Sequence, residues 1–286
     1  MSVKLLSGNT MPLIGFGTFQ IRGRQLIYDV LNNALNAGFR SFDTAAVYGN
    51  EQDIGLALKE LLPKYSLQRE DVFITSKLSP SDHADRVETA IERSLSNLGL
   101  RYLDLYLIHW PGASGIPVDS TDNRALRSYS WKALVKAKQK GYLKAIGVSN
   151  YTIRHMQELL SNCYGVKPDV NQVEWHPHYH QTDLLDLCRK EGVLLQAYSS
   201  LGSSNDKTLL RDPVVNSVAK KLNKSPAQIL LRWALQQGVG IIPKARSKEH
   251  IEDNIKLNFV ISEEDVNLLN NIKKDDKYAW DPTVVV

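Results

Sequence analysis

The stretch GFRSFDTAAVYGNEQDIG, residues 38–55, contains one complete strand-to-helix unit. Its apolar residues predict a short strand at residues 41–44, and the apolar spacing that follows predicts a helix at residues 51–62. A carboxylate, Asp43, lies near the end of this strand, and a phenol, Tyr48, lies in the link to the helix. We therefore expect a buried strand with chemically active side chains at its carboxyl end.

The same alternation of strand and helix continues along the whole chain. Short, mostly uninterrupted apolar runs, as expected of strands buried on both faces, lie at residues 13–18, 41–44, 72–77, 103–109, 145–149, 170–174, 194–198 and 240–243. Segments with apolar residues at three-to-four spacing lie at residues 25–37, 51–62, 84–98, 131–140, 153–161, 184–190 and 226–237. Strands that are each followed by a helix predict an α/β fold, a parallel (β/α)8 TIM barrel.

The amino-terminal segment VKLLSGNTMPLIG, residues 3–15, has Gly-Asn between two apolar runs. It predicts an N-terminal hairpin that closes the floor of the barrel. We find no linker, repeat or low-complexity segment, so we expect a single domain over residues 1–286. The alternative fold is an open, doubly wound sheet, which helical spacing alone does not exclude. No GxGxxG motif follows the first strand, and this weakens a Rossmann interpretation.

The composition is that of an ordinary globular protein, with 43% hydrophobic and 23% charged residues. The 35 basic and 31 acidic side chains leave a formal charge of +4, spread along the chain, so we expect no nucleic-acid partner and no membrane partner. The chain has two cysteines, Cys163 and Cys188, which argue against a disulfide scaffold and suit a reducing compartment. No apolar run is long enough for a signal peptide or a membrane span. These features predict a cytoplasmic protein.

Four side chains with complementary chemistry stand at neighbouring strand ends. Asp43, Lys77 and His109 end the second, third and fourth predicted strands, and Tyr48 follows the second. Taken singly, each has a plain structural explanation, such as a helix cap, a solvated lysine or a packed ring. The carboxyl ends of parallel barrel strands meet at one rim, so we expect the four groups to lie together.

Together these groups suit the reduction of a carbonyl by hydride, which leaves an alkoxide that needs a proton. Tyr48 would supply that proton, and its pKa, ordinarily about 10, would have to be lowered for work near neutral pH. We expect the ammonium of Lys77 to lower it, and Asp43 to keep the buried lysine charged. His109 would hydrogen-bond the carbonyl and orient it.

With these residues in family order, the chain resembles the aldo-keto reductase family over residues 15–254. The resemblance implies a barrel with two extra helices, at residues 212–222 and 262–272. It implies a monomer that reduces a small-molecule carbonyl substrate. In that reaction Tyr48 would be the acid, and Asp43, Lys77 and His109 would support it.

The resemblance also implies NADPH as the cofactor, because no side chain delivers a hydride by itself. Three polar side chains would bond the nicotinamide carboxamide: Ser149, Asn150 and Gln172. The ring of Tyr198 would stack on the nicotinamide. The other predicted cofactor contacts are Gly17, Thr18, Asp43, Ser199, Leu201, Lys244, Arg246, Ser247, His250 and Asn254.

The basic cluster after the last strand bears on the choice between NADPH and NADH. Lys244 and Arg246 would meet an adenosine 2′-phosphate, which favours NADPH. The chain departs from the family pattern here, with Ala245 and His250 where relatives usually carry serine and arginine. We expect Arg246 and Ser247 to compensate, so that NADPH stays the preferred cofactor. The alternative is a solvated helix start with no phosphate contact.

The predicted walls of the substrate pocket are aromatic. Phe19 and Trp110 are expected there, together with Tyr48 and His109, and the polar loop at residues 112–127 is expected to overhang the opening. The tail after the last predicted helix is short, so we expect an open pocket. Small reactive aldehydes, dicarbonyls and activated ketones would then be good substrates.

Two other classes of protein remain open on the sequence. A protein with this fold can serve as a catalytically weak structural or regulatory protein, and turnover of a simple aldehyde would distinguish it. A strand-end lysine such as Lys77 can also form a Schiff base in aldol chemistry. Borohydride trapping of an adduct would identify that reaction.

Overall fold

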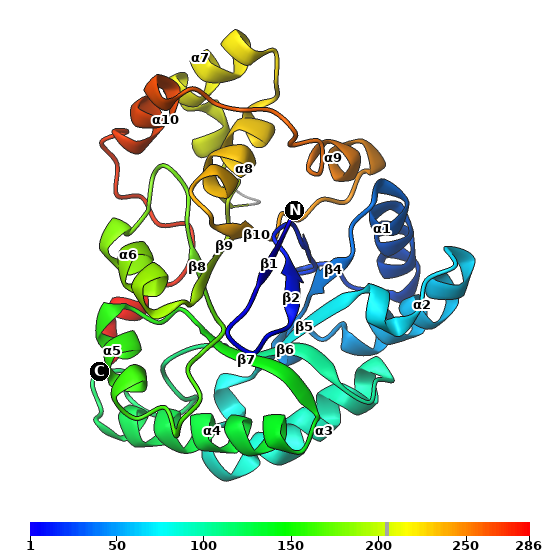
Figure 1. The fold of residues 1–286 in the computed structure, drawn as a ribbon, viewed down its shortest axis with the longest axis vertical. Helices are drawn as coiled ribbons and strands as arrows, with labels where there is room; N and C mark the ends of the chain where they lie inside the picture. Colours follow the sequence, from blue (N-terminus) through cyan, green and yellow to red (C-terminus); the bar gives the residue numbers. More distant parts are fainter. Residues whose placement is uncertain (204–205) are drawn as a thin grey trace.

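An eight-stranded parallel sheet curls around the centre of the molecule, as the computed structural model of residues 1–203 and 206–286 shows (Figure 1). Its strands pair in chain order. They are β3 (Phe16–Gly17), β4 (Ser41–Asp43), β5 (Phe73–Leu78), β6 (Leu103–Ile108), β7 (Leu143–Ser149), β8 (Val170–Glu174), β9 (Leu194–Tyr198) and β10 (Gly240–Ile241).

The sheet closes on itself between its first and last strands. The backbone N–H of Gly15 donates to the carbonyl of Ile241 at 2.8 Å, and that of Ile241 donates to Leu13 at 2.7 Å. The N–H of Gly17 continues this seam to Pro243 at 3.1 Å. These bonds make the sheet a barrel, so the predicted (β/α)8 fold is confirmed and the open doubly wound sheet is wrong.

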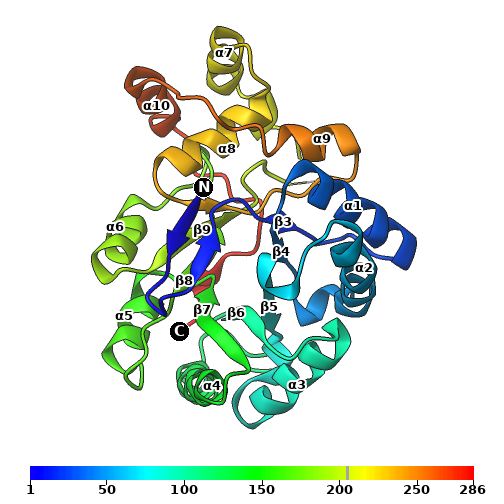
Figure 2. The same cartoon turned by 45° about the vertical axis from the view of Figure 1, so that its right-hand side comes forward.

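Helices follow the strands and surround the barrel (Figures 1 and 2). Their buried residues recur on one face and pack with the outward-facing residues of the strands in one large apolar cluster. The helices that follow the barrel strands are α1 (Arg24–Ala37), α2 (Glu51–Lys64), α3 (Val87–Leu98), α4 (Asp122–Gln139), α5 (Ile153–Ser161), α6 (Thr182–Glu191), α8 (Pro226–Gln236) and α9 (Lys248–Asp253).

An antiparallel hairpin, β1 (Ser2–Lys4) and β2 (Thr10–Pro12), lies across one opening of the barrel (Figure 1). Its Met11 is fully buried and belongs to a second apolar cluster with inward-facing strand residues such as Leu105 and Leu107. This end of the barrel is therefore closed by side chains, and the predicted N-terminal hairpin is confirmed. The site must open at the other end, where the strands finish.

Two further helices lie outside the barrel ring. They are α7 (Pro213–Leu222), before α8, and α10 (Glu263–Asn270), after α9, and both views place them next to each other (Figures 1 and 2). The two extra helices are thus confirmed.

Among the residues that the structure describes, no helix combines the length and the apolar character that crossing a membrane requires.

One predicted boundary is wrong in a way that affects the site. Helix α4 begins at Asp122, not near residue 131, so the last six residues of the predicted loop at residues 112–127 are helical. The apolar spacing did not indicate this turn because the buried face there is polar and includes Asn123 and Arg127. Arg127 is buried because its guanidinium forms an ion pair with Glu158 at 3.0 Å.

Candidate active site

The four predicted catalytic side chains meet at the open end of the barrel. Asp43 is the last residue of β4, Lys77 lies near the end of β5, and His109 directly follows β6. Tyr48 stands on a single 3₁₀ turn, Ala46–Tyr48, that links β4 to α2. The register of the parallel strands brings them together, since Asp43 pairs with Thr75 two residues before Lys77.

Lys77 is the centre of this group, and its side chain is completely buried. The Nζ atom lies 2.5 Å from Oδ1 of Asp43 and donates to the backbone carbonyl of Thr44 at 2.8 Å. The same Nζ atom lies 3.4 Å from the hydroxyl oxygen of Tyr48, its third hydrogen-bond partner. Burial lowers the pKa of Lys77, and the Asp43 carboxylate opposes that shift. The ion pair is what keeps a charge beside the phenol.

The pKa of Tyr48 is shifted upward, which is opposite to the expectation from the sequence. Burial is the main cause, and the Asp43 carboxylate adds to it. The ammonium of Lys77 is close, but removal of the phenol from water has the larger effect. Tyr48 therefore stays in its protonated form, the form that can donate a proton.

His109 is also neutral. Burial, and next the charge of Lys77, place its pKa well below the ordinary value of 6.5. Its ring meets the Tyr48 ring edge-on, with 5.7 Å between centroids. Its Nδ1 has no partner among the described residues. The imidazole and the phenol thus form the adjacent polar groups of an otherwise aromatic wall.

A network of amides and hydroxyls supports the other side of the group. Gln172 Nε2 donates to Oδ2 of Asp43 at 2.8 Å, so both carboxylate oxygens are bonded. Ser149 Oγ donates to the backbone carbonyl of Gln172 at 2.7 Å. Asn150 donates to the backbone carbonyl of His109 at 2.9 Å and accepts from the hydroxyl of Tyr198 at 2.6 Å.

Asn150 has a backbone φ of 64°, a left-handed conformation that asparagine tolerates better than most residues. The residue therefore leaves the end of β7 sharply and turns its amide toward the site. Ser199, just after β9, has a similar φ of 52°. Both predicted cofactor contacts stand where the backbone is bent at a strand end.

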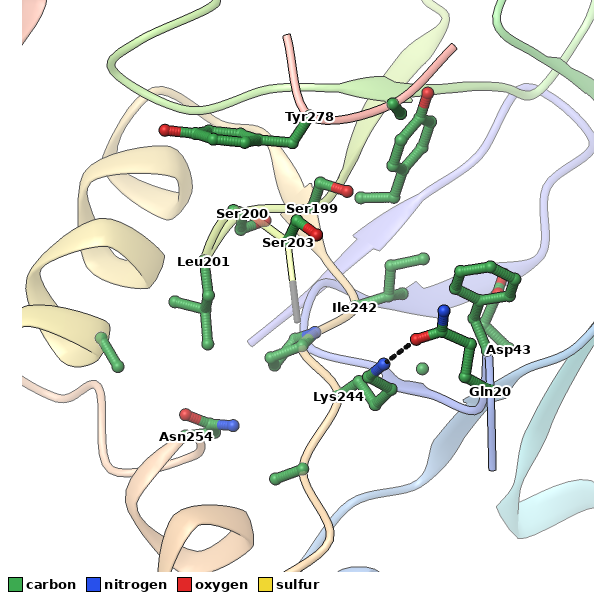
Figure 3. A pocket seen from close by; sticks show the side chains of 18 of the residues that line it. Gln20, Asp43, Ser199, Ser200, Leu201, Ser203, Ile242, Lys244, Asn254 and Tyr278 are labelled. Atoms are coloured by element: carbon green, nitrogen blue, oxygen red, sulfur yellow. Dashed lines mark hydrogen bonds between the residues drawn. The ribbon is translucent and has the colours of Figure 1, made fainter. Parts of the chain in front are cut away.

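A cleft of about 960 Å³ opens above these residues and extends away from them. Figure 3 shows Ser199, Ser200 and Leu201 along one side, with Lys244 and Asn254 on the opposite side. Asp43 lies at the far end of the same space (Figure 3). The predicted contacts that line the cleft are Gly17, Phe19, Asp43, Tyr48, His109, Trp110, Ser149, Asn150, Gln172, Tyr198, Ser199, Leu201, Lys244, His250 and Asn254.

Three predicted cofactor contacts lie outside the lining of the cleft and have other partners. The buried hydroxyl of Thr18 donates to the backbone carbonyl of Asp43 at 2.8 Å. Arg246 donates to the backbone carbonyl of Gln20 at 2.8 Å. Ser247 caps α9 by accepting from the backbone N–H of His250.

Sequence reasoning missed several residues that line the cleft. Gln20 accepts from Lys244 at 3.0 Å, and Lys207 contributes another cation. Tyr278 and Trp280 come from the carboxyl-terminal tail, and the Trp280 ring meets Trp110 edge-on at 4.5 Å. Nothing in the sequence indicated the positive φ of 63° at Gln20. The two aromatic residues in the otherwise polar tail, Tyr278 and Trp280, could have been identified as candidates.

The cleft fits a nicotinamide dinucleotide in the chemistry of its lining. One end presents the amides and hydroxyls of the strand ends beside Tyr48 and His109. In the middle, Ser200 Oγ is buried without a partner among the described residues. At the other end, burial lowers the pKa of Lys244, and the charges of Arg246 and Lys207 lower it further. Such a cluster of cations is suited to phosphate.

Comparison with known proteins agrees with this geometry. A sequence model of the Aldo/keto reductase family matches residues 13–274. The chain is 40% identical over 307 residues to aldo-keto reductase family 1 member A1-A of Danio rerio, covering 99% of this chain and 93% of the relative. It is 39% identical over 283 residues to glyoxal reductase of Bacillus subtilis (strain 168), covering 98% and 96%.

A solved structure, an aldo-keto reductase enzyme from a Medee basin deep-sea metagenome library, superposes with a TM-score of 0.89. Its sequence is 35% identical, and the match covers 99% of this chain and 98% of that one. Similarity of this extent in sequence and fold covers the barrel and every element that forms the cleft. The chain therefore belongs to the aldo/keto reductase family, oxidoreductases that act on carbonyl compounds.

Proposed function

We propose that this protein reduces aldehydes and ketones to alcohols, with NADPH as the hydride donor and Tyr48 as the proton donor. One observation carries the proposal above the others. The buried ammonium of Lys77 is joined to Asp43 at 2.5 Å and lies 3.4 Å from the hydroxyl of Tyr48. The neutral ring of His109 stands beside the phenol. A buried charge beside a phenol and a neutral imidazole is the arrangement that proton transfer to a carbonyl oxygen requires.

Bound NADPH would supply the hydride that adds to the carbonyl carbon. His109 would donate a hydrogen bond to the carbonyl oxygen and hold it near the phenol. Tyr48 would transfer its proton to that oxygen as negative charge develops there, which leaves an alcohol and a phenolate. Lys77 would stabilise the phenolate through its charge, and Asp43 would keep Lys77 protonated until solvent returns the proton to Tyr48.

The cofactor would lie along the cleft. Ser149, Asn150 and Gln172 would bond the carboxamide, and the ring of Tyr198 would pack against the nicotinamide. Lys244 would meet the 2′-phosphate at the far end, which makes NADPH the preferred form. Binding titrations with both cofactors test this part separately, since equal affinities for NADH and NADPH would remove the 2′-phosphate contact.

Small reactive carbonyl compounds are the proposed substrates. The pocket beside the catalytic residues is walled by rings, with Phe19 against Tyr48 at 5.0 Å between centroids and Trp110 stacked on His109 at 6.3 Å. Flat apolar walls suit aldehydes and dicarbonyls better than sugars, whose hydroxyls would need polar partners. The glyoxal reductase among the relatives supports the same class of substrate.

We further propose that the protein acts as a cytoplasmic monomer.

The test is turnover of NADPH with a panel of aldehydes and ketones, comparing wild type with Tyr48→Phe. Loss of the acid should lower kcat by a factor on the order of 10² to 10⁴. Tyr129→Phe, a change at an exposed tyrosine outside the lining of the cleft, is the matched control and should keep full activity. If wild type binds NADPH but reduces no carbonyl, a structural or regulatory role replaces the proposal.

A further inference from the structure

The carboxyl-terminal tail, residues 273–286, is held across the open end of the barrel at two places. The first is Glu174, the last residue of β8, which is 3% exposed. The proposed reaction does not use this carboxylate. Its contacts nevertheless connect the barrel to residues more than 100 positions later, since Glu174 and Lys277 are 103 apart in the chain.

The Glu174 carboxylate accepts hydrogen bonds from three consecutive tail residues. Lys277 Nζ lies 2.7 Å from Oε2, the backbone N–H of Tyr278 lies 2.5 Å from Oε1, and that of Ala279 lies 3.3 Å from Oε2. His176 Nε2 lies 3.1 Å from Oε1. Burial acts to raise the pKa of Glu174, but these bonds outweigh it and the pKa is lowered. The anchor is thus a buried, ionised carboxylate.

The second anchor lies on α4 and α5. Val285 is fully buried, and its backbone carbonyl accepts from the guanidinium of Arg154 and from Nε2 of His155, the latter at 3.0 Å. The neighbouring backbone carbonyl of Val286 accepts from Arg127 at 2.8 Å. Basic side chains therefore hold this end of the tail, and an acid holds the other.

The segment between the anchors lies over the cleft. Tyr278, whose hydroxyl is 3.0 Å from Nδ1 of His178, lies beside the Ser199–Ser203 side of the cleft (Figure 3). Trp280 is 47% exposed and packs edge-on against Trp110, which stacks on His109. Trp280 is therefore one ring further from the reacting centre than Trp110. A substrate of two or three carbons held by His109 would not reach it, whereas an aromatic substrate would.

We propose that Glu174 is a positioning residue that holds residues 277–280 as a strap, so that Trp280 forms the outer wall of the carbonyl pocket and adds a contact for aromatic substrates that reach beyond Trp110. The proposal rests on the proposed reductase function for its kinetic consequence. Its structural content, that the carboxylate fixes the place of Trp280, is independent of any turnover.

Two substitutions release the first anchor in different ways. In Glu174→Gln, an amide NH₂ replaces an oxygen where every tail partner is a donor, so at least one bond becomes a contact between donors. Lys277→Met removes one of the three tail donors, the ammonium of a half-buried side chain, and leaves the barrel strand unchanged. Lys277→Arg keeps a cation for the carboxylate and should restore wild-type behaviour. Lys273→Met, at an exposed lysine in the same tail, is the control.

The kinetic experiment compares KM and kcat for methylglyoxal and for 2-naphthaldehyde. Both anchor variants should raise KM for 2-naphthaldehyde about tenfold, the value of one lost apolar contact, and change kcat and the methylglyoxal KM less than about twofold. Equal effects on both substrates would overturn the selectivity, because a general disturbance of the barrel would produce them. Absence of any carbonyl reduction in wild type would refute the proposed function instead.

A fluorescence experiment tests the strap without turnover. Acrylamide quenching is measured with each protein and with its Trp280→Phe counterpart, and the difference isolates Trp280 from the other tryptophans. Trp280 is already 47% exposed, so Glu174→Gln and Lys277→Met should raise its quenching constant by about 1.5-fold to 2-fold, while Lys277→Arg and Lys273→Met should match wild type. Unchanged quenching in both anchor variants would show that Glu174 does not position the strap.

Discussion

Replacement of Lys77 by methionine is the sharpest test of the buried ion pair. The lysine side chain is completely buried, and that of Asp43 is 4% exposed. Methionine keeps the unbranched apolar stem but removes the charge that lies 2.5 Å from the carboxylate. Asp43 is then a buried charge whose remaining side-chain donor is Gln172, at 2.8 Å. Loss of one partner from such a pair costs about 3–5 kcal/mol.

A second substitution separates the charge from the packing. The double variant Asp43→Asn, Lys77→Met has no orphaned charge, and its asparagine oxygen can still accept from Gln172. We expect it to recover at least about half of the stability that Lys77→Met loses, since a neutral buried pair is not penalised as a lone charge is. It should stay inactive, because nothing then stabilises the phenolate of Tyr48.

The assay is urea unfolding followed by circular dichroism, with thermal melting beside it. At roughly 2–4 °C per kcal/mol for a chain of this size, Lys77→Met should melt about 10 °C lower than wild type. Carbonyl reduction is measured on the same samples. The reasoning is refuted if Lys77→Met is within about 1 kcal/mol of wild type, or if the double variant is no more stable than the single one.

Two further outcomes follow from the same structure. His83 and His155 are buried, burial lowers the pKa of each to about 4, and the unfolded chain therefore binds protons first as pH falls from 6.5. The free energy of unfolding should decrease over pH 6.5 to 4 by about 3 kcal/mol for each histidine, and urea titrations that gave a flat profile there would contradict this. Gly17→Ala would place a Cβ 2.6 Å from the backbone carbonyl of Ile242 in the closing seam, so it should lower stability by about 1–3 kcal/mol. Calorimetry measures the melting temperature of this variant and of a control, Gly112→Ala, whose added carbon has its nearest neighbour at 3.5 Å. The control should melt at a higher temperature than Gly17→Ala.

The alternation of apolar strands and amphipathic helices predicted a parallel α/β fold, because its strands are buried on both faces, and the resemblance to the aldo-keto reductases favoured the barrel over the doubly wound sheet. The same logic failed at Asn123 and Arg127, where the buried face of α4 is polar. The spacing of apolar residues could not predict that Arg127 is buried, because its partner Glu158 lies 31 residues away and only the fold brings the two together.

The site shows a similar division between local and long-range information. Strand ends could be identified from the sequence, so Asp43, Lys77 and His109 could be expected at one rim. The anchoring of the tail could not, because it depends on contacts of Glu174 with residues 103 to 105 positions away. The direction of the Tyr48 pKa shift was also out of reach, since it depends on how much water the assembled barrel removes from the phenol.

Burial has one consistent effect on the groups around the proposed reacting carbonyl. It favours the neutral form of Lys77, Tyr48 and His109, and at Lys77 the carboxylate of Asp43, with a smaller effect of Glu51, opposes it. The result is one ion pair and two neutral rings that still carry protons. Neutral donors in a dry pocket cost little while the carbonyl is uncharged and interact strongly once its oxygen becomes negative. The depth of the site in the barrel, more than any single charge, would therefore make Tyr48 an effective acid.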